Sequence, residues 1–259
     1  MTELLFLGTS AGVSTANRQH CSMALKKDGR IYLFDCGCSA STLLKKMGED
    51  PRNIEAVFLT HWHPDHASGL PMLIQDLQLT GRKTALPVYG PESTARKVEQ
   101  LQNMFLIPPD VCPFEVETTE YDESTVFDDG RIRIEFFRTM HLAQDNWKKI
   151  DERRGFEMTP IAYGMVIYSD GKKIVHSGDV HTSNDLVPVL PEADLVVHEF
   201  GHIVPEKLNA FVKEQGIANL LLTHIHHEWD QRADELKRIV SDGHSGEVRV
   251  AYDLMRYAI

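Results

Sequence analysis

The stretch Thr60-His61-Trp62-His63-Pro64-Asp65-His66 places three histidines and one aspartate within six consecutive positions. It follows the apolar run Ala56-Val57-Phe58-Leu59, which has the pattern of a short buried β-strand. We therefore expect these side chains at the point where a strand ends and the chain turns. Imidazole and carboxylate groups are the side chains that bind zinc and similar divalent ions.

The spacing within this stretch favours two metal ions. His61 and His63 are two positions apart, so in an extended segment their side chains point the same way. Asp65 and His66 follow a proline that helps to turn the chain, so their side chains can bind a second metal ion nearby. A lone His-x-His pair is more often a surface or core feature. The added aspartate and histidine therefore make a metal site the preferred interpretation.

The pattern His-x-His-x-Asp-His after a hydrophobic strand resembles the signature of the metallo-β-lactamase superfamily. This resemblance implies an α/β fold, a four-layer αββα sandwich, formed as a single domain over residues 1–259. It also implies three further ligands at strand ends, which are His141, Asp179 and His224. By the same resemblance, the first metal is held by His61, His63 and His141, and the second by Asp65, His66 and His224. Asp179 would bridge two divalent ions, for which zinc is expected and manganese or iron stays open.

Length and composition agree with a single compact enzyme and are ordinary for a soluble globular protein. The chain has 259 residues, of which 42% are hydrophobic and 25% charged. No apolar run approaches the roughly 20 residues that span a bilayer, and the first residues lack the pattern of a signal peptide. The four cysteines show no disulfide framework. We therefore expect a reduced, cytoplasmic protein without a membrane partner.

The net charge constrains the partners. It is −11 at pH 7, whereas proteins that bind a long polyanion usually carry a basic stripe. Long nucleic acid is therefore disfavoured as a partner. A small anionic substrate is compatible, because two divalent cations invert the local field. A homodimer is left open.

Hydrophobic periodicity predicts alternating strands and helices in two similar halves. The expected helices cover residues 70–79, 93–106, 205–215 and 233–240. The expected strands lie near residues 4–7, 31–34, 56–59, 132–137, 161–167, 174–176, 195–197 and 220–222. Such alternation predicts layered sheets covered by helices.

Four segments resemble the ribonuclease Z and cyclic-phosphate phosphodiesterase group. Phe6–Val13 resembles the opening of ribonuclease Z, and Leu33–Gly37 places Asp35 where it can bond a ligand imidazole or cap the next helix. Asp194–Glu199 resembles a His-Glu motif in which His198 would protonate the leaving oxygen. Thr223–Asp230 resembles the cyclic-phosphate phosphodiesterase, with His227 as a substrate contact.

Two departures from ribonuclease Z are visible. The stretch Leu142–Pro160 is too short for the Gly/Pro-rich arm that grips transfer RNA, and Val180-His181 replaces the usual residues after Asp179. His20, His202 and His244 lie in polar surroundings and are expected at the surface, as is His226.

The favoured function is therefore a dinuclear metal-dependent phosphodiesterase that acts on a small, cyclic or open, phosphodiester. A hydroxide that bridges the metals would attack phosphorus, with Asp65 orienting it and accepting its proton. A ribonuclease Z-like endoribonuclease is the alternative within the group, and a thioesterase or lactonase is the alternative in another class. A structural or sensor domain is disfavoured, because structural zinc sites are closed by four ligands.

Overall fold

The computed structural model describes residues 2–143, 150 and 159–259. The chain divides into two compact units, Met1–Tyr121 with Ala251–Ile259, and Asp122–Val250. The described part of each unit is built on one seven-stranded sheet. This division does not test the expected single domain over residues 1–259, which stays a prediction. The short segment predicted to replace an RNA-gripping arm falls largely outside the described residues.

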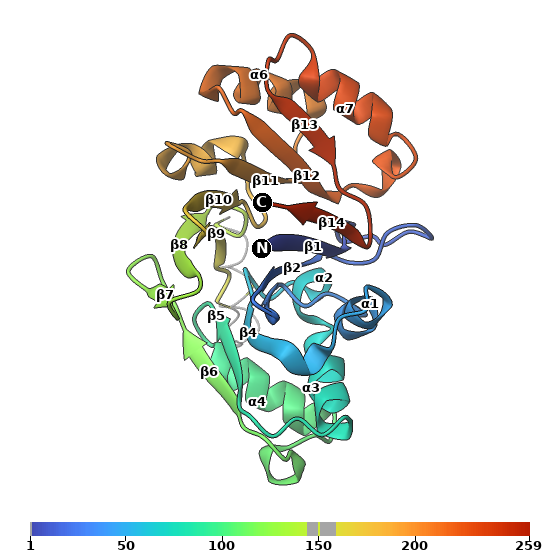
Figure 1. Cartoon of the computed structure of the whole chain (residues 1–259), viewed down its shortest axis with the longest axis vertical. Helices are drawn as coiled ribbons and strands as arrows, with labels where there is room; N and C mark the ends of the chain where they lie inside the picture. The colour runs from blue at the N-terminus through green and yellow to red at the C-terminus, as the bar shows by residue number, and fades with distance from the viewer. Residues whose placement is uncertain (1, 144–149, 151–158) are drawn as a thin grey trace. The chain divides into compact units, whose positions relative to one another are not determined.

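The sheet of the first unit has the strand order β14-β1-β2-β3-β4-β5-β6. Pairing is antiparallel from β14 to β3 and parallel from β3 to β6. The last strand of the chain lies beside the first, as the dark red and dark blue arrows of Figure 1 show. The strands are β1 (Glu3–Gly8), β2 (Ser22–Lys27), β3 (Arg30–Phe34), β4 (Ile54–Phe58), β5 (Leu86–Gly90), β6 (Val116–Glu120) and β14 (Met255–Ala258).

The helices of the first unit bury an apolar stripe against one face of this sheet. In α3 (Leu70–Leu79) the buried residues Leu70, Leu73, Ile74 and Leu77 recur at helical spacing. They pack in one cluster with alternate residues of β1 and β3, such as Leu33. The other helices are α1 (Ala40–Lys46), the short α2 (Pro64–Ala67) and α4 (Thr94–Met104), with 3₁₀ turns at Pro51–Asn53 and Pro109–Val111.

The sheet of the second unit has the strand order β13-β12-β11-β10-β9-β8-β7. Its strands are antiparallel from β7 to β10 and parallel from β10 to β13. The strands are β7 (Val126–Asp128), β8 (Arg133–Thr139), β9 (Ala162–Ser169), β10 (Lys172–His176), β11 (Leu195–Phe200), β12 (Asn219–Ile225) and β13 (Glu247–Val250).

Helices α6 (Pro205–Gln215) and α7 (Ala233–Ser241) cover one face of this second sheet (Figure 1). Leu208, Phe211 and Val212 of α6 pack against Val196 of β11 and Leu222 of β12. Two 3₁₀ segments, Ser183–Val189 and His227–Trp229, connect the strands. None of the helices in the described ranges is long and apolar enough to cross a bilayer.

Candidate metal centre

The histidine-rich stretch occupies the connection between β4 and α2. His61 lies in the extended segment after the strand, and His63 is the residue that precedes the helix. Pro64 takes the first helical position, where its missing N–H costs nothing, and it brings Asp65 and His66 into the first turn. Extended backbone followed at once by helix therefore gathers the four candidate ligands at the carboxyl end of β4.

Asp35 is bound to this stretch by several hydrogen bonds. It directly follows β3, the parallel neighbour of β4, so both strands deliver their next residues to the same sheet edge. Its carboxylate accepts hydrogen bonds from N and Oγ1 of Thr60 at 2.7–3.0 Å, and its Oδ2 lies 2.7 Å from Nδ1 of His66. A different residue, Ser39, precedes α1. Of the two roles predicted for Asp35, the structure therefore shows the bond to imidazole.

The hydrogen bonds of the first unit orient its imidazole rings. Nδ1 of His61 lies 3.0 Å from Oγ1 of Thr60, and Nδ1 of His66 faces Asp35. The Nε2 atoms are then the ones directed away from these partners. Nε2 of His66 lies 3.4 Å from Oδ2 of Asp65, and the ring of His61 is centred 4.1 Å from that of His66.

Asp179 is the centre of the cluster in the second unit. Its Oδ2 lies 3.6 Å from Nε2 of His141, and its Oδ1 lies 3.4 Å from Nε2 of His224. Ligand atoms on one tetrahedral zinc ion stand about 3.3 Å apart, since the bonds are about 2.0–2.1 Å long. Each oxygen of Asp179 thus has the spacing to one imidazole that a shared ion requires, as expected of a carboxylate that bridges two ions.

The backbone at two of these positions is unusual. Asp35 has a φ of 57° and His224 a φ of 51°, both in the left-handed region. Non-glycine residues in this region are uncommon and are enriched at functional sites. At His224 the turn interrupts the regular pairing of β12 with β11, whose register shifts between Glu199 and Phe200.

Glu199 and His202 join the same cluster, although neither was predicted as a site residue. Nδ1 of His202 lies 3.0 Å from Oε1 of Glu199 and 4.0 Å from Oδ2 of Asp179. Burial lowers the pKa of His202, but the hydrogen bond and charge of Glu199 outweigh this effect and raise the pKa above its usual range. The ring of His202 is centred 4.6 Å from that of His141, and its side chain is 39% exposed.

The expectation that His202 lies at the surface is confirmed, because the residue is exposed, but its ring also contacts the cluster around Asp179. Its partner Glu199 is almost fully buried and also accepts backbone hydrogen bonds from Gly201 and His202. The sequence carried a signal for this arrangement, since Glu199 ends a buried strand and His202 follows three residues later in a Gly-containing turn.

His198 does not agree with the role predicted for it. The ring is fully buried and meets Phe211 of α6 edge-on, with centroids 6.4 Å apart. It thus faces the helix side of the sheet, whereas the adjacent Glu199 points to the other side, as alternation along a strand requires. Burial lowers the pKa of His198 and favours the neutral ring. We do not assign proton donation to it.

The two histidines after β12 differ in exposure. His227 is exposed, and His226 is half-buried with 38% of its side chain exposed, so His226 reaches the surface as expected. Their rings lie 4.3 Å apart, and Nδ1 of His226 accepts a hydrogen bond from N of Glu228. The predicted contact of His227 with substrate stays a prediction.

Residues 30–239 match the family described as the Beta-lactamase superfamily domain. The chain belongs to this superfamily. Ribonuclease Z of Methanothermobacter thermautotrophicus is 26% identical to it, and the match covers 87% of each chain. The predicted metal-dependent hydrolase is thereby confirmed, together with the predicted resemblance to ribonuclease Z.

Solved structures confirm the fold class. The metallo-β-lactamase fold protein YhfI from Bacillus subtilis matches with a TM-score of 0.79 and 20% identity, over 99% of this chain and 98% of that one. A diphosphatase from the PhnP family matches with a TM-score of 0.69 and 16% identity, over 100% and 98%. Zn²⁺-bound PqqB from Methylobacterium extorquens matches with a TM-score of 0.69 and 14% identity, over 99% and 100%. The superfamily fold implies divalent metal ions, and the His/Asp clusters fit them.

Proposed function

We propose that this hydrolase is a phosphodiesterase with two divalent metal ions that cleaves small phosphodiesters. The observation that carries the proposal is the position of Asp179, whose two oxygens each face a different imidazole at 3.4 and 3.6 Å. A carboxylate that can bind one ion with each of its oxygens suits a dinuclear hydrolase whose metals accept oxygen ligands.

The proposed ligands are those expected from the sequence. The complete set is His61, His63, Asp65, His66, His141, Asp179 and His224. We propose zinc as the metal, because nitrogen-rich sites with carboxylate suit it and a related fold is known with zinc bound.

When bound, such ions lower the pKa of a coordinated water and stabilise negative charge on a phosphoryl group. The protein's own contribution begins with Asp65, whose side chain is 12% exposed and whose carboxylate can accept a proton from the attacking water. Asp35 supports this stretch by holding Nδ1 of His66. The imidazole is thereby fixed in one tautomer and one orientation.

Proton donation to the leaving oxygen is assigned to His202. Glu199 engages Nδ1, so Nε2 carries the proton that is donated. The ring is partly exposed and contacts the cluster around Asp179, so a leaving group can reach it. The buried carboxylate beside it favours the imidazolium form, which general acid catalysis requires.

The proposed substrate is small and anionic. The net charge of −11 offers little attraction to a long polyanion. A diphosphatase shares the fold at full length, which supports phosphorus chemistry on a compact substrate. The specific observation in favour of a second candidate, an endoribonuclease, is the similarity to ribonuclease Z over 87% of each chain.

The test compares metal-replete protein on cyclic nucleotides, bis-nitrophenyl phosphate, a precursor tRNA, a thioester and a lactone, each at low and high salt. We expect turnover of the small phosphodiesters with a shallow salt dependence. Efficient, strongly salt-dependent cleavage of the tRNA would establish the endoribonuclease instead. Turnover of the thioester or lactone without any phosphodiester cleavage would refute the proposal.

A further inference from the structure

The loop between β1 and β2 is fastened at both ends by one carboxylate. Oδ1 of Asp253 accepts hydrogen bonds from N and Oγ1 of Thr9 at 2.9 and 2.7 Å. Its Oδ2 accepts a hydrogen bond from N of Gln19 at 2.6 Å. Asp253 precedes β14, which pairs with β1, so it arrives where the loop begins. A residue near the C-terminal end of the sequence thus closes a loop near its start.

Arg18 reinforces this closure from inside the loop. It is only 5% exposed, and its Nη1 donates to Oγ1 of Thr9 at 2.6 Å and to the carbonyl oxygen of Ala251 at 2.7 Å. At the base of the loop a Cβ on Gly8 would lie 2.0 Å from the carbonyl oxygen of His20. The returning limb therefore crosses directly over this glycine, where no side chain fits.

The tip of the loop lies against a proposed metal ligand. Gly12, Val13 and Ser14 are exposed, and Val13 is 55% exposed. A Cβ on Gly12 would lie 3.6 Å from Oδ2 of Asp65. The closed loop thus holds the exposed backbone of Gly12 beside the carboxylate that would accept a proton from the attacking water, and the exposed Val13 follows it in the chain.

We propose that Asp253 is a positioning residue for the reaction, and that the loop tip Ala11–Ser14 forms one wall of the substrate site. This inference rests on the proposed function of the neighbouring metal centre. Asp253 acts through the loop and touches no substrate. Its two oxygens accept from both loop ends at once, which asparagine cannot do, because its amide NH₂ would face an N–H donor.

The test uses Asp253→Asn with two readouts. Trypsin cleaves after arginine, so cleavage between Arg18 and Gln19 reports opening of the loop, since Arg18 is buried when the loop is closed. We expect this cleavage to become about tenfold faster, the factor that loss of one buried hydrogen bond produces. We also expect KM to rise about tenfold with kcat changed less, because the wall contributes to binding. KM is measured with the substrate that the activity screen identifies, and metal content should not change.

Glu49→Gln is the matched control. Glu49 belongs to the same unit and binds Arg256 of β14, but it makes no hydrogen bond to the loop. We expect this variant to retain the wild-type KM and the slow cleavage at Arg18. Equal effects in both variants would mean general weakening of the unit and would overturn the inference.

The remaining outcomes test the role of Asp253 and the role of the loop tip separately. Unchanged cleavage at Arg18 in Asp253→Asn would overturn the role of Asp253, and faster cleavage with an unchanged KM would overturn the role of the tip as a wall. If the wild-type protein hydrolyses a thioester but no phosphodiester, the proposed function is wrong. The cleavage rate at Arg18 and the KM for the thioester then still test the roles of Asp253 and the loop tip.

Discussion

Glu199 holds His202 by a contact of 3.0 Å between Oε1 and Nδ1. The carboxylate is almost fully buried, whereas the imidazole is partly exposed. A buried acid thus orients a ring whose other nitrogen is directed away from it. This relationship, within one turn after β11, supports the proposed assignment of proton donation to His202.

We predict that His202→Ala retains its metal and loses activity. The loss should be about 10²–10⁴-fold for an alkoxide leaving group and smaller for nitrophenolate, which needs the proton less. His198→Ala should show no such dependence on the leaving group, and His226→Ala serves as a half-buried histidine control. Rates on both kinds of substrate are the measurement. If only the His198 variant discriminates between leaving groups, the assignment to His202 is wrong.

Asp179→Ala should lower the metal content from two ions per chain to one or none. The reason is that both carboxylate oxygens face candidate ligands, at 3.4 and 3.6 Å from their Nε2 atoms. Elemental analysis of metal-replete protein measures the content. Asp194→Ala, which removes a partly exposed carboxylate paired with Lys172, should leave it unchanged. Two ions retained in the Asp179 variant would rule out a bridging role.

Asp35→Asn should weaken metal affinity without removing a ligand. Its carboxylate bonds Nδ1 of His66 at 2.7 Å, and loss of such a partner typically costs about 10–100-fold in affinity. Competition with a chromophoric chelator gives the affinity. The control Asp76→Asn removes a carboxylate that binds Ser41 and Lys45 in the same unit. Equal affinities in wild type and Asp35→Asn would limit this aspartate to a structural role.

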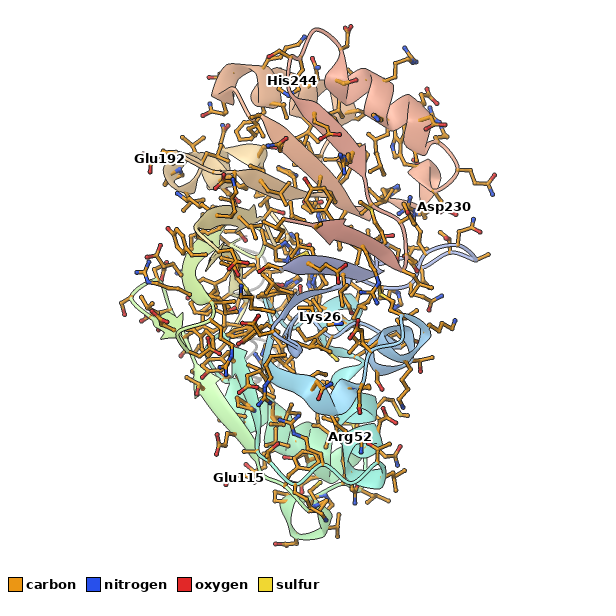
Figure 2. All side chains as sticks on the ribbon, viewed as in Figure 1. Lys26, Arg52, Glu115, Glu192, Asp230 and His244 are labelled. Atoms are coloured by element: carbon orange, nitrogen blue, oxygen red, sulfur yellow. The ribbon has the colours of Figure 1, made fainter. Side chains whose placement is uncertain are left out.

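Glu49 should contribute to stability in a pH-dependent way. Burial raises its pKa, but hydrogen bonds from Lys26, labelled in Figure 2, and from Arg256 outweigh burial and lower the pKa below its usual range. The contribution is therefore present above the unfolded-state pKa and is lost as the pH falls through the folded-state pKa.

Glu49→Gln should accordingly reduce the free energy of unfolding near neutral pH by about 1 kcal/mol, since both basic partners are partly exposed. In acid, below the folded-state pKa, variant and wild type should converge. Urea unfolding at both pH values is the measurement. A difference that persists in acid would show that packing, and not charge, accounts for the effect.

Much of the fold was predictable wherever apolar periodicity is strong. The predicted helices at residues 70–79 and 205–215 have the observed bounds of α3 and α6, because their buried residues recur at helical spacing. Strands such as β6, with the partly exposed and exposed sequence Val116–Glu120, escaped prediction. In β6 the pairing with β5 determines the strand, and the local sequence has no alternation of buried and exposed residues that would predict it.

The sequence by itself indicated the superfamily and the candidate ligands, because these residues lie at or shortly after the ends of apolar strands. Alternation along β11 also indicated that His198 and Glu199 face opposite sides. Only the tertiary structure decided which of the two faces the candidate cluster around Asp179, because that depends on α6 packing over His198. The tertiary structure likewise decided that Asp253 binds Thr9, which lies 244 positions earlier in the sequence, because β14 pairs with β1. Contacts between distant segments depend on sheet order, which short-range patterns do not encode.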